Sequence, residues 1–510
     1  MRILFLADQP WQLKLIESII NNLRIENNSV KASIALVDVF TFLHAPQLIS
    51  KVSNNLEIEI DTLEDKFANW QKIKCIISKE EDEFLSSWAK ANSHERTISQ
   101  IEKSNQWIYG FENEVFYKKT SKKWKRKFLI DTIIWCESII KKEQYDLIFS
   151  VERATLPVNI FWSISRSRQI PFLTLFHSRV QYNWVLQDNF GFGTSDEILK
   201  IANSKEYSEA NLQTEKYLEL FHQSRIGSYE SFEHRADISP APSTRAMFKN
   251  LILELRRFLG RVWSRMFRER RKFKFKVRRF EQNLLKLSIF DLKIIVYTFL
   301  VRNRIMSIEG NKITGDYFFW ALHARPEGSV QALSGGVDEI SLLRNFASLL
   351  PEGVMLQVKE NSLMLGRRRL GFYRELNSIR NVNIVGLNEN TYSLIKNSKG
   401  VAGLTGTVLL ESAILNKPSF TFGNPEFIDF IFSRNILPVD QFINLSLKGS
   451  LPENLNSTYG YISYCLTHGV NAPLYDFDEF ATGEAQHASK QISKKLNRYL
   501  TEVLDSEKRN

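Results

Sequence analysis

The sequence predicts an α/β protein with two doubly wound domains, and three observations lead to this prediction. Its 510 residues are more than one hydrophobic core usually accommodates. Short apolar runs alternate with amphipathic stretches over residues 2–176, and the same alternation returns over residues 317–422. This alternation is typical of parallel strands that are connected by helices.

The first domain is expected to begin as strand, helix, strand. Residues 2–7 form an apolar run, residues 11–23 carry apolar side chains at helical spacing, and residues 32–37 are again apolar. Residues 61–142 are charged and poor in glycine and proline, which indicates a helical insertion or the outer helices of the same domain. The alternation then resumes with a strand at 146–151, a helix at 156–168 and a strand at 171–176. Residues 183–243 are interpreted as loop-rich.

The second α/β unit is expected from about Gly315. Its predicted strands are 317–322, 354–358, 382–385, 400–404 and 419–422, and its predicted helices are 339–350, 370–377, 392–397 and 408–415. The predicted division is an N-terminal domain at 1–244, a basic linker at 245–310, a C-terminal domain at 311–456 and a helical tail at 457–510. Tails of this kind often return to the first domain, and the two domains are expected to face a cleft.

The net charge of +11 is concentrated in one segment. From Arg245 to Glu281 there are 14 Lys or Arg and 3 Asp or Glu, and apolar residues recur at helical spacing. Three interpretations remain open: a solvated helix packed on the protein, an interfacial helix on an anionic membrane surface, and a nucleic-acid-binding patch. Our working hypothesis is an anionic inner-membrane surface as partner, and we expect no nucleic acid.

The spacing of the cysteines and the hydropathy of the chain indicate its cellular compartment. Cys75, Cys136 and Cys465 are too far apart for a metal or disulfide motif, which indicates a reducing environment. The apolar run at residues 3–7 is too short for a signal peptide, and the run at 287–301 contains charges and is too short to span a membrane. We therefore expect a cytoplasmic protein, soluble or peripheral on the inner membrane, that uses neither a metal nor a resident cofactor.

A candidate phosphate-binding turn follows the predicted strand at 400–404. Gly406 allows close approach of a ligand to the backbone, Thr405 and Thr407 supply hydroxyl groups, and the following helix offers free N–H groups. Thr407 is expected near the N-cap of that helix. Glu411, one turn further, suits a sugar hydroxyl rather than a phosphate. An ordinary strand-turn-helix unit with a threonine cap is the alternative.

Polar residues follow the predicted strands of both halves. The positions directly after the strands are occupied by Asp8, Glu152, His177, His323, Lys359 and Thr405. Ligands of open α/β sheets bind at the carboxyl ends of strands, so these residues predict a shared cleft with acid, base and phosphate-binding groups. Two alternatives remain open. His323 can be a histidine whose hydrogen bonds are formed within a loop, and Lys359 can belong to a surface ion pair.

Other motifs carry little information. The chain contains no GxSxG, HExxH or complete P-loop motif. Gly191-Phe192-Gly193 does not complete a dinucleotide fingerprint. Asp476-Phe477-Asp478 matches a metal-binding DxD pattern, but it lies in an acidic loop near the end of the chain and is interpreted as solvated.

Four segments of the second half resemble, in order and spacing, the bacterial capsule polysaccharide biosynthesis family. They are YFFWALHARPEGS (317–329), LSGGVDE (333–339), LLPEGVMLQVKENSLMLGRRRLGFYREL (349–376) and GLTGTVLLESAILNKPSFTFG (403–423). Residues 144–153 and 171–180 resemble its first-domain landmarks more weakly. The resemblance implies a GT-B architecture with the donor nucleotide in the second domain and the acceptor on the first. The best understood branch of the family transfers Kdo from CMP-Kdo and retains the anomeric configuration.

The resemblance implies a donor site made of His323, Glu327, Lys359, Glu360, Thr405, Gly406, Thr407 and Glu411. Two positions depart from the family pattern. Where the family has LHxQPE and KEHP, this chain has Arg325 before Pro326 and Asn361 after Glu360, which points to a different donor or an altered activity.

Glu152 is the first candidate for the reacting carboxylate, Asp188 is the second, and His323 is a further catalytic candidate. A retaining enzyme needs a carboxylate nucleophile and an inverting enzyme a general base, and the residues do not separate the two. The resulting hypothesis is a glycosyltransferase that moves a sugar from a nucleotide-linked donor, CMP-linked by resemblance, to a glycan or glycolipid acceptor. A non-catalytic glycan- or nucleotide-binding partner of an assembly or export complex is the alternative.

Overall fold

The computed structural model describes most of the chain and divides it into two compact units. The described residues are 1–37, 46–63, 77–92, 122–152, 155–188, 194–204, 207, 211–224, 252, 256, 296–297, 315–324, 338–361, 364, 368–369, 371–387, 389–433, 435–451, 458–474 and 483–507. The first unit comprises Met1–Gly110, Thr120–Thr214 and Tyr459–Asn510, and the second contains Glu215–Thr458. The basic segment falls outside the described residues apart from Ile252 and Arg256.

The first unit is built on a seven-stranded sheet in the order β13-β6-β5-β4-β1-β2-β3. Its parallel strands are β1 (Arg2–Ala7), β2 (Lys31–Leu36), β3 (Ile60–Thr62), β4 (Leu147–Val151) and β5 (Phe172–His177). Two antiparallel strands, β6 (Asn183–Gln187) and β13 (Val470–Asn471), extend one edge. The buried apolar strands were predictable because parallel strands are covered on both faces.

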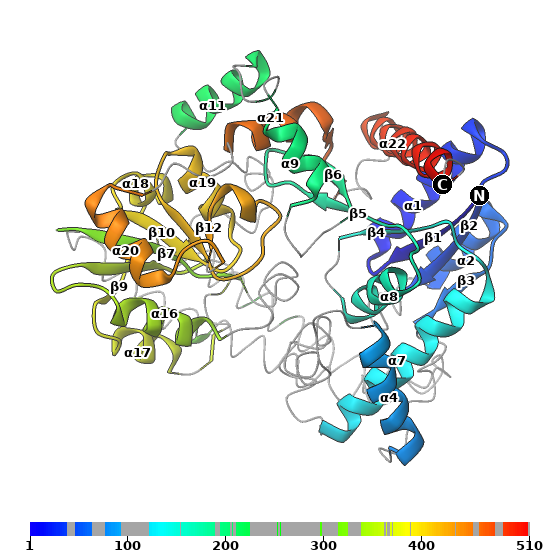
Figure 1. Ribbon diagram of the computed structural model, residues 1–510, viewed down its shortest axis with the longest axis horizontal. Helices are drawn as coiled ribbons and strands as arrows, with labels where there is room; N and C mark the ends of the chain where they lie inside the picture. The colour runs from blue at the N-terminus through cyan, green and yellow to red at the C-terminus, as the bar shows by residue number, and fades with distance from the viewer. Residues whose placement is uncertain are drawn as a thin grey trace. The chain divides into compact units, whose positions relative to one another are not determined.

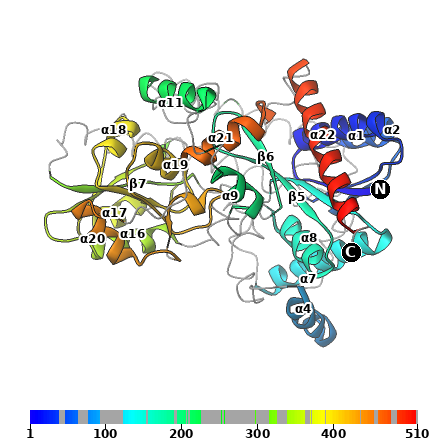
Figure 2. The same ribbon diagram turned by 45° about the horizontal axis from the view of Figure 1, so that its top comes forward.

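Helices cover both faces of this sheet. The helices of this unit are α1 (Pro10–Glu26), α2 (Pro46–Leu56), α4 (Lys79–Asn92), α7 (Lys122–Lys142), α8 (Leu156–Ser167), α9 (Asp196–Ala202), α21 (Thr458–His468) and α22 (Gly483–Glu507). Helix α11 (Leu212–Ser224) lies mostly in the second unit, which contains the residues from Glu215 onward. Figures 1 and 2 show α1, α2 and α22 on one face and α7 and α8 on the other. Within 61–142, α4 and α7 agree with the expected helical insertion. The interpretation of 183–243 as loop-rich was wrong for β6, α9 and α11, whose short mixed sequences give weak periodicity.

The C-terminal tail returns to the first unit, as expected. Helix α22 packs along α1, and the hydroxyl oxygens of Ser18 and Ser489 lie 2.7 Å apart. Ile492, Leu496 and Leu500 of α22 belong to the same buried cluster as the strands of the sheet. Residues more than 450 positions apart in the chain therefore share one hydrophobic core.

The second unit contains a six-stranded, all-parallel sheet in the order β12-β11-β10-β7-β8-β9. Its strands are β7 (Tyr317–Ala321), β8 (Met355–Lys359), β9 (Val382–Ile384), β10 (Gly400–Gly403), β11 (Ser419–Thr421) and β12 (Phe432–Ser433). Its helices are α16 (Glu339–Ser348), α17 (Phe372–Asn377), α18 (Thr391–Lys396), α19 (Thr407–Ile414) and α20 (Val439–Lys448), with a short 3-10 turn at Ile428–Phe430. Figures 1 and 2 show α16 and α17 on one face and α18 and α19 on the other.

Both units have a switch point at which the strand order reverses. Strand β1 lies between β2 and β4 in the first sheet, and β7 lies between β8 and β10 in the second. In the first sheet, β1, β2 and β3 follow one another toward one edge, and β4, β5 and β6 follow one another toward the other edge. In the second sheet, β7, β8 and β9 run toward one edge, and β10, β11 and β12 run toward the other. This is the doubly wound topology, so the predicted fold class is confirmed, and ligands of such sheets bind outside the carboxyl ends at the switch point. Within the described helices, none is long and apolar enough to cross a membrane.

Candidate functional site at the second switch point

The candidate site lies at the carboxyl ends of β7 and β10. His323 follows β7, and the turn Thr405-Gly406-Thr407 follows β10. The two segments are in direct contact, because the backbone N–H of Thr405 donates a hydrogen bond of 3.2 Å to Nε2 of His323. The structure thus brings together the histidine and the turn that the sequence singled out separately.

A buried carboxylate fixes the tautomer of His323. Nε2 accepts the Thr405 bond, so the ring proton of the neutral histidine resides on Nδ1, which lies 3.0 Å from Oε1 of Glu339. The same oxygen accepts bonds from the backbone N–H of His323, at 3.2 Å, and from Nε1 of Trp320, at 3.3 Å. The side chains of His323 and Glu339 are only 4% and 3% exposed. Nε2 therefore contacts the turn, and Nδ1 contacts the buried carboxylate that orients the ring.

The turn lies close against His323. Gly406 is the N-cap of α19, without a side-chain cap bond, and Thr407 is its first residue, one position inside the expected cap. A Cβ atom at Gly406 would lie 3.1 Å from Nε2 of His323, which is tighter than most real contacts. Oγ1 of Thr405 is buried and has no hydrogen-bond partner among the described residues.

Lys359 ends β8 and bonds to the loop that precedes α18. Its Nζ atom donates to the backbone oxygen of Glu389 at 2.5 Å and to Oγ1 of Thr391 at 2.9 Å. Burial lowers the pKa of Lys359 to about 8, although the carboxylates of Glu389 and Glu411 act in the opposite direction. Glu411 lies on α19 and is buried. The site thus holds a cation whose charge changes close to physiological pH.

Glu360 is held inside the protein by a buried ion pair. Its carboxylate accepts bonds of 2.9 and 2.7 Å from Nε and Nη2 of Arg368, and a 2.7 Å bond from the hydroxyl group of Tyr373. Nη2 of Arg368 also donates a 2.8 Å bond to the backbone oxygen of His323. Arg368 therefore connects the end of β8 to the histidine turn at the end of β7.

Sequence reasoning missed the roles of Arg368, Tyr373 and Glu339. All three lie in segments that carry the family resemblance, yet Arg368 is preceded by Arg367 and followed by Arg369, and such runs usually indicate an exposed surface. Only their three-dimensional contacts distinguish buried Arg368 from exposed Arg369. Two other predicted residues, Arg325 and Glu327, lie outside the described residues.

The switch point of the first unit carries the predicted carboxylate Glu152. The side chain of Gln12 bridges the two strand ends, accepting from the backbone N–H of Asp8 at 2.8 Å and donating to the backbone oxygen of Val151 at 3.2 Å. Glu152 follows with a φ of 60°, a left-handed conformation that costs a non-glycine residue energy. Its N–H donates to the oxygen of Leu175 at 2.8 Å, and its own oxygen accepts from Oγ of Ser150 at 2.7 Å. The backbone is thus held in a strained conformation at the predicted edge.

The other first-unit candidates lie at different places. His177, at the end of β5, is buried and packs edge-on against Trp184, with ring centroids 5.2 Å apart. Asp188 follows β6, which runs antiparallel to β5, with Gln187 paired to Thr174. Asp188 is therefore exposed near the amino-terminal edge of the sheet, opposite to Glu152. The fold brings Asp8 and Glu152 together and separates Asp188 from them.

Comparisons with known proteins give weak similarity to sugar-handling enzymes. A Kdo transferase of KpsC from Thermosulfurimonas dismutans, described as a beta Kdo 2,4 transferase, aligns at 11% identity and a TM-score of 0.33 over 63% of this chain and 80% of its own. The beta Kdo 2,7 transferase of the same protein gives 11% identity and a TM-score of 0.28 over 74% and 98%. UDP-GlcNAc 2-epimerase from Neisseria meningitidis, solved with UDP-GlcNAc, gives 11% identity and a TM-score of 0.21 over 98% of this chain and 100% of its own.

No family model and no curated protein matches the sequence. At these TM-scores the structural likeness does not by itself carry a functional conclusion. The functional argument therefore rests on the residues of the two switch points.

Proposed function

We propose that this protein is a glycosyltransferase of surface polysaccharide assembly that binds a CMP-linked sugar at the switch point of the second unit. The observation that carries the proposal is the Thr405-Gly406-Thr407 turn, held against His323 at the place where open α/β sheets bind ligands. The first N–H groups of α19 suit a phosphate. The four segments that resemble the capsule polysaccharide biosynthesis family support the choice of donor.

In this proposal, the charged residues around the turn contact different parts of the donor. Lys359 faces the negative charge of the donor, and Glu411 accepts hydrogen bonds from its hydroxyl groups. His323, Glu360 and Arg368 act by positioning, because their polar atoms bond to one another and to the turn. The nucleotide sugar is the only co-substrate that the proposal requires.

Glu152 supplies the reacting carboxylate. In a retaining reaction it attacks the anomeric carbon, the bond from that carbon to the phosphate oxygen breaks, and CMP leaves with the electron pair. The oxygen of an acceptor hydroxyl then bonds to the anomeric carbon, the bond from that carbon to Glu152 breaks, and the hydroxyl proton passes to the departing carboxylate of Glu152. Glu152 directly follows β4 at the switch point of the first sheet, and this position supports the role.

A transfer assay with two carboxylate variants tests this assignment. Glu152→Gln should abolish transfer and leave the affinity for the nucleotide unchanged, because the carboxylate and the nucleotide turn lie in different units. Glu57→Gln is the matched control, since Glu57 is an exposed glutamate of the first unit with a φ of 55°. Loss of transfer in Asp188→Asn but not in Glu152→Gln would instead assign the reacting carboxylate to Asp188, at the opposite edge of the sheet.

Association with the inner membrane is a separate part of the proposal and rests on the sequence of residues 245–281. Neutral replacements of the arginines at 268, 270, 271, 278 and 279 should release the protein from vesicles that contain anionic lipid. Unchanged co-sedimentation with such vesicles would remove the membrane from the proposal, and the transferase would remain.

A further inference from the structure

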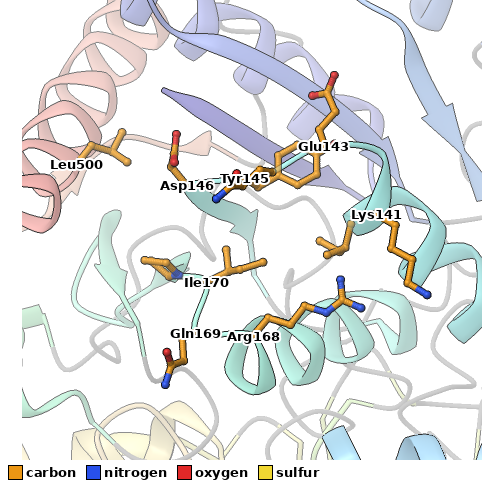
Figure 3. Close-up of a pocket in the computed structure, with 11 residues that line it drawn as sticks. Lys141, Glu143, Tyr145, Asp146, Arg168, Gln169, Ile170 and Leu500 are labelled. Atoms are coloured by element: carbon orange, nitrogen blue, oxygen red, sulfur yellow. The ribbon is translucent and has the colours of Figure 1, made fainter. Parts of the chain in front are cut away.

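A cavity of about 490 Å³ lies at the amino-terminal edge of the first sheet, opposite to Glu152. Its walls are the loop before β4, the loop before β5 and Leu500 of α22. Figure 3 shows Tyr145 and Asp146 on one side and Arg168 and Gln169 on the other. The volume is in the range of small-molecule sites. Nothing in the proposed transfer reaction uses this place.

The lining combines an apolar part with hydrogen-bonding groups of every kind. Ile140, Ile170, Pro171 and Leu500 are the apolar residues, and Lys141, Glu143, Gln144, Tyr145, Asp146, Arg168 and Gln169 are the polar ones. Among the described residues, neither Gln144 nor Gln169 hydrogen-bonds to another side chain or to the backbone through its amide. Each amide can donate and accept, as a hydroxyl group can.

The charges of the lining are largely compensated from outside the cavity. Asp146 accepts a 2.7 Å bond from the backbone N–H of Arg2, and Nε of Arg2 lies 2.9 Å from Glu143. Arg168 forms an ion pair with Glu137. These contacts leave a polar cavity without a strong field of either sign.

Helix geometry argues against an anionic occupant. The two loops follow the carboxyl ends of α7 and α8, where helices carry partial negative charge. The turn after α8 closes with bonds from Gln169 to Arg166 at 3.3 Å and from Ile170 to Ser165 at 2.8 Å, which is the arrangement that normally places glycine where Gln169 stands. Gln169 instead has a φ of 56°. A side chain is thus retained at the rim where glycine would be less strained.

We propose that this cavity binds a neutral, hydroxyl-rich ligand, namely a segment of glycan that does not react. Sugar hydroxyl groups match the amides and carboxylates of the rim, and the apolar residues match the C–H faces of a sugar ring. The binding itself needs no turnover. Its role, holding a remote part of the acceptor chain, rests on the proposed function.

Saturation-transfer NMR on the full chain tests the cavity without any activity. The probes are glucose, galactose, N-acetylglucosamine and short neutral oligomers of each, with glucuronic acid and inorganic phosphate as anionic counter-probes. The test variant is Gln144→Ala/Gln169→Gly, which removes both amides and relieves the strained backbone. The matched control is Gln213→Ala/Asn416→Gly, because Gln213 is exposed and Asn416 is an exposed residue with a φ of 53° after α19.

The proposal predicts that the wild type and the control variant bind a neutral probe. In the test variant, the affinity for that probe should fall about fivefold or more for each lost amide. Equal binding by the test and control variants would overturn the site. Preference for glucuronic acid or phosphate would overturn the ligand class, and absence of binding by every neutral probe would overturn the proposal. Failure of the transferase would leave these results unchanged, because the assay contains no donor.

Discussion

Thr405 and His323 join the carboxyl ends of two neighbouring strands through one hydrogen bond, from the N–H of Thr405 to Nε2 of His323 at 3.2 Å. The bond crosses the switch point of the second sheet, where the strand order reverses. It requires an unprotonated Nε2, and Nδ1 faces Glu339. We interpret His323 as a residue that positions the nucleotide turn, rather than as the proton-transfer group considered from the sequence.

Removal of the His323 side chain should destabilise the second unit. His323→Ala removes one of the three donors to the buried carboxylate of Glu339 and leaves the N–H of Thr405 without its acceptor, at a cost of about 2 kcal/mol. Glu339→Gln keeps an acceptor oxygen and should cost less. Urea unfolding of both single variants and the double variant measures their coupling. Additive effects would contradict the proposed contact.

Arg368→Lys should be far more damaging than Arg369→Lys. A lysine keeps the charge but cannot reproduce the paired bonds to Glu360 and the bond to the oxygen of His323, so we expect a loss of at least about 2 kcal/mol and weaker nucleotide binding. Arg369 forms an exposed ion pair with Glu375, and its replacement should change stability by less than about 0.5 kcal/mol. Similar unfolding midpoints for the two variants would disprove the positioning role.

Glu152→Gly should separate stability from activity. Glycine adopts the φ of 60° without strain, so stability should stay unchanged or rise by up to about 1 kcal/mol while transfer is lost. Glu57→Gly relieves the same conformation, at a φ of 55°, and should keep full activity. Thermal unfolding and the transfer assay give both quantities. An active Glu152→Gly variant would show that this carboxylate does not react.

Lys359 should make both donor affinity and stability depend on pH. Its pKa is lowered to about 8 in the folded protein, so it loses its charge there, and affinity for an anionic donor should fall as the pH rises through 8. Between about pH 8 and the unfolded value of 10.5 the unfolded chain binds more protons, so the stability contribution of Lys359 rises with pH.

Lys359→Arg and Lys359→Met are the controls for this pH dependence. Arginine stays charged across the window and should remove the fall in affinity, whereas methionine should remove the rise in stability. Titration of nucleotide affinity and of unfolding free energy between pH 7 and 10 checks both. A fall in affinity that persists in Lys359→Arg would assign the titration to another group.

The sequence was sufficient for the elements around the site, because strands buried on both faces are short, apolar and interrupted by polar residues. The predicted strand at 354–358 and helix at 408–415 each lie within one residue of β8 and α19. Strand β6 was missed because a short strand with the polar residues Asn183 and Gln187 at its ends resembles a loop. The edge at which Asp188 lies could not be predicted either, since it depends on the antiparallel direction of β6.

Pairwise contacts within the site were less predictable than its location. Position after a strand identified Lys359 and His323, but it could not show that Glu360 is enclosed by Arg368 and Tyr373. Such bonds depend on how the loops after β7 and β8 fold together, and loop geometry leaves little periodic signal in a sequence.

The most direct test of the central claim is a thermal-shift comparison of CMP, CDP, UDP, GDP and ADP with the wild type, Gly406→Ala and Gly403→Ala. A Cβ at Gly406 would press on Nε2 of His323 at 3.1 Å, whereas one at Gly403 meets its nearest atom at 3.7 Å. At 100 times the dissociation constant a ligand stabilises by about 2.7 kcal/mol. The account predicts stabilisation by CMP that is lost in Gly406→Ala and kept in Gly403→Ala. Stabilisation by another nucleotide alone would contradict the CMP-linked donor, and no response to any nucleotide would favour the non-catalytic glycan-binding alternative.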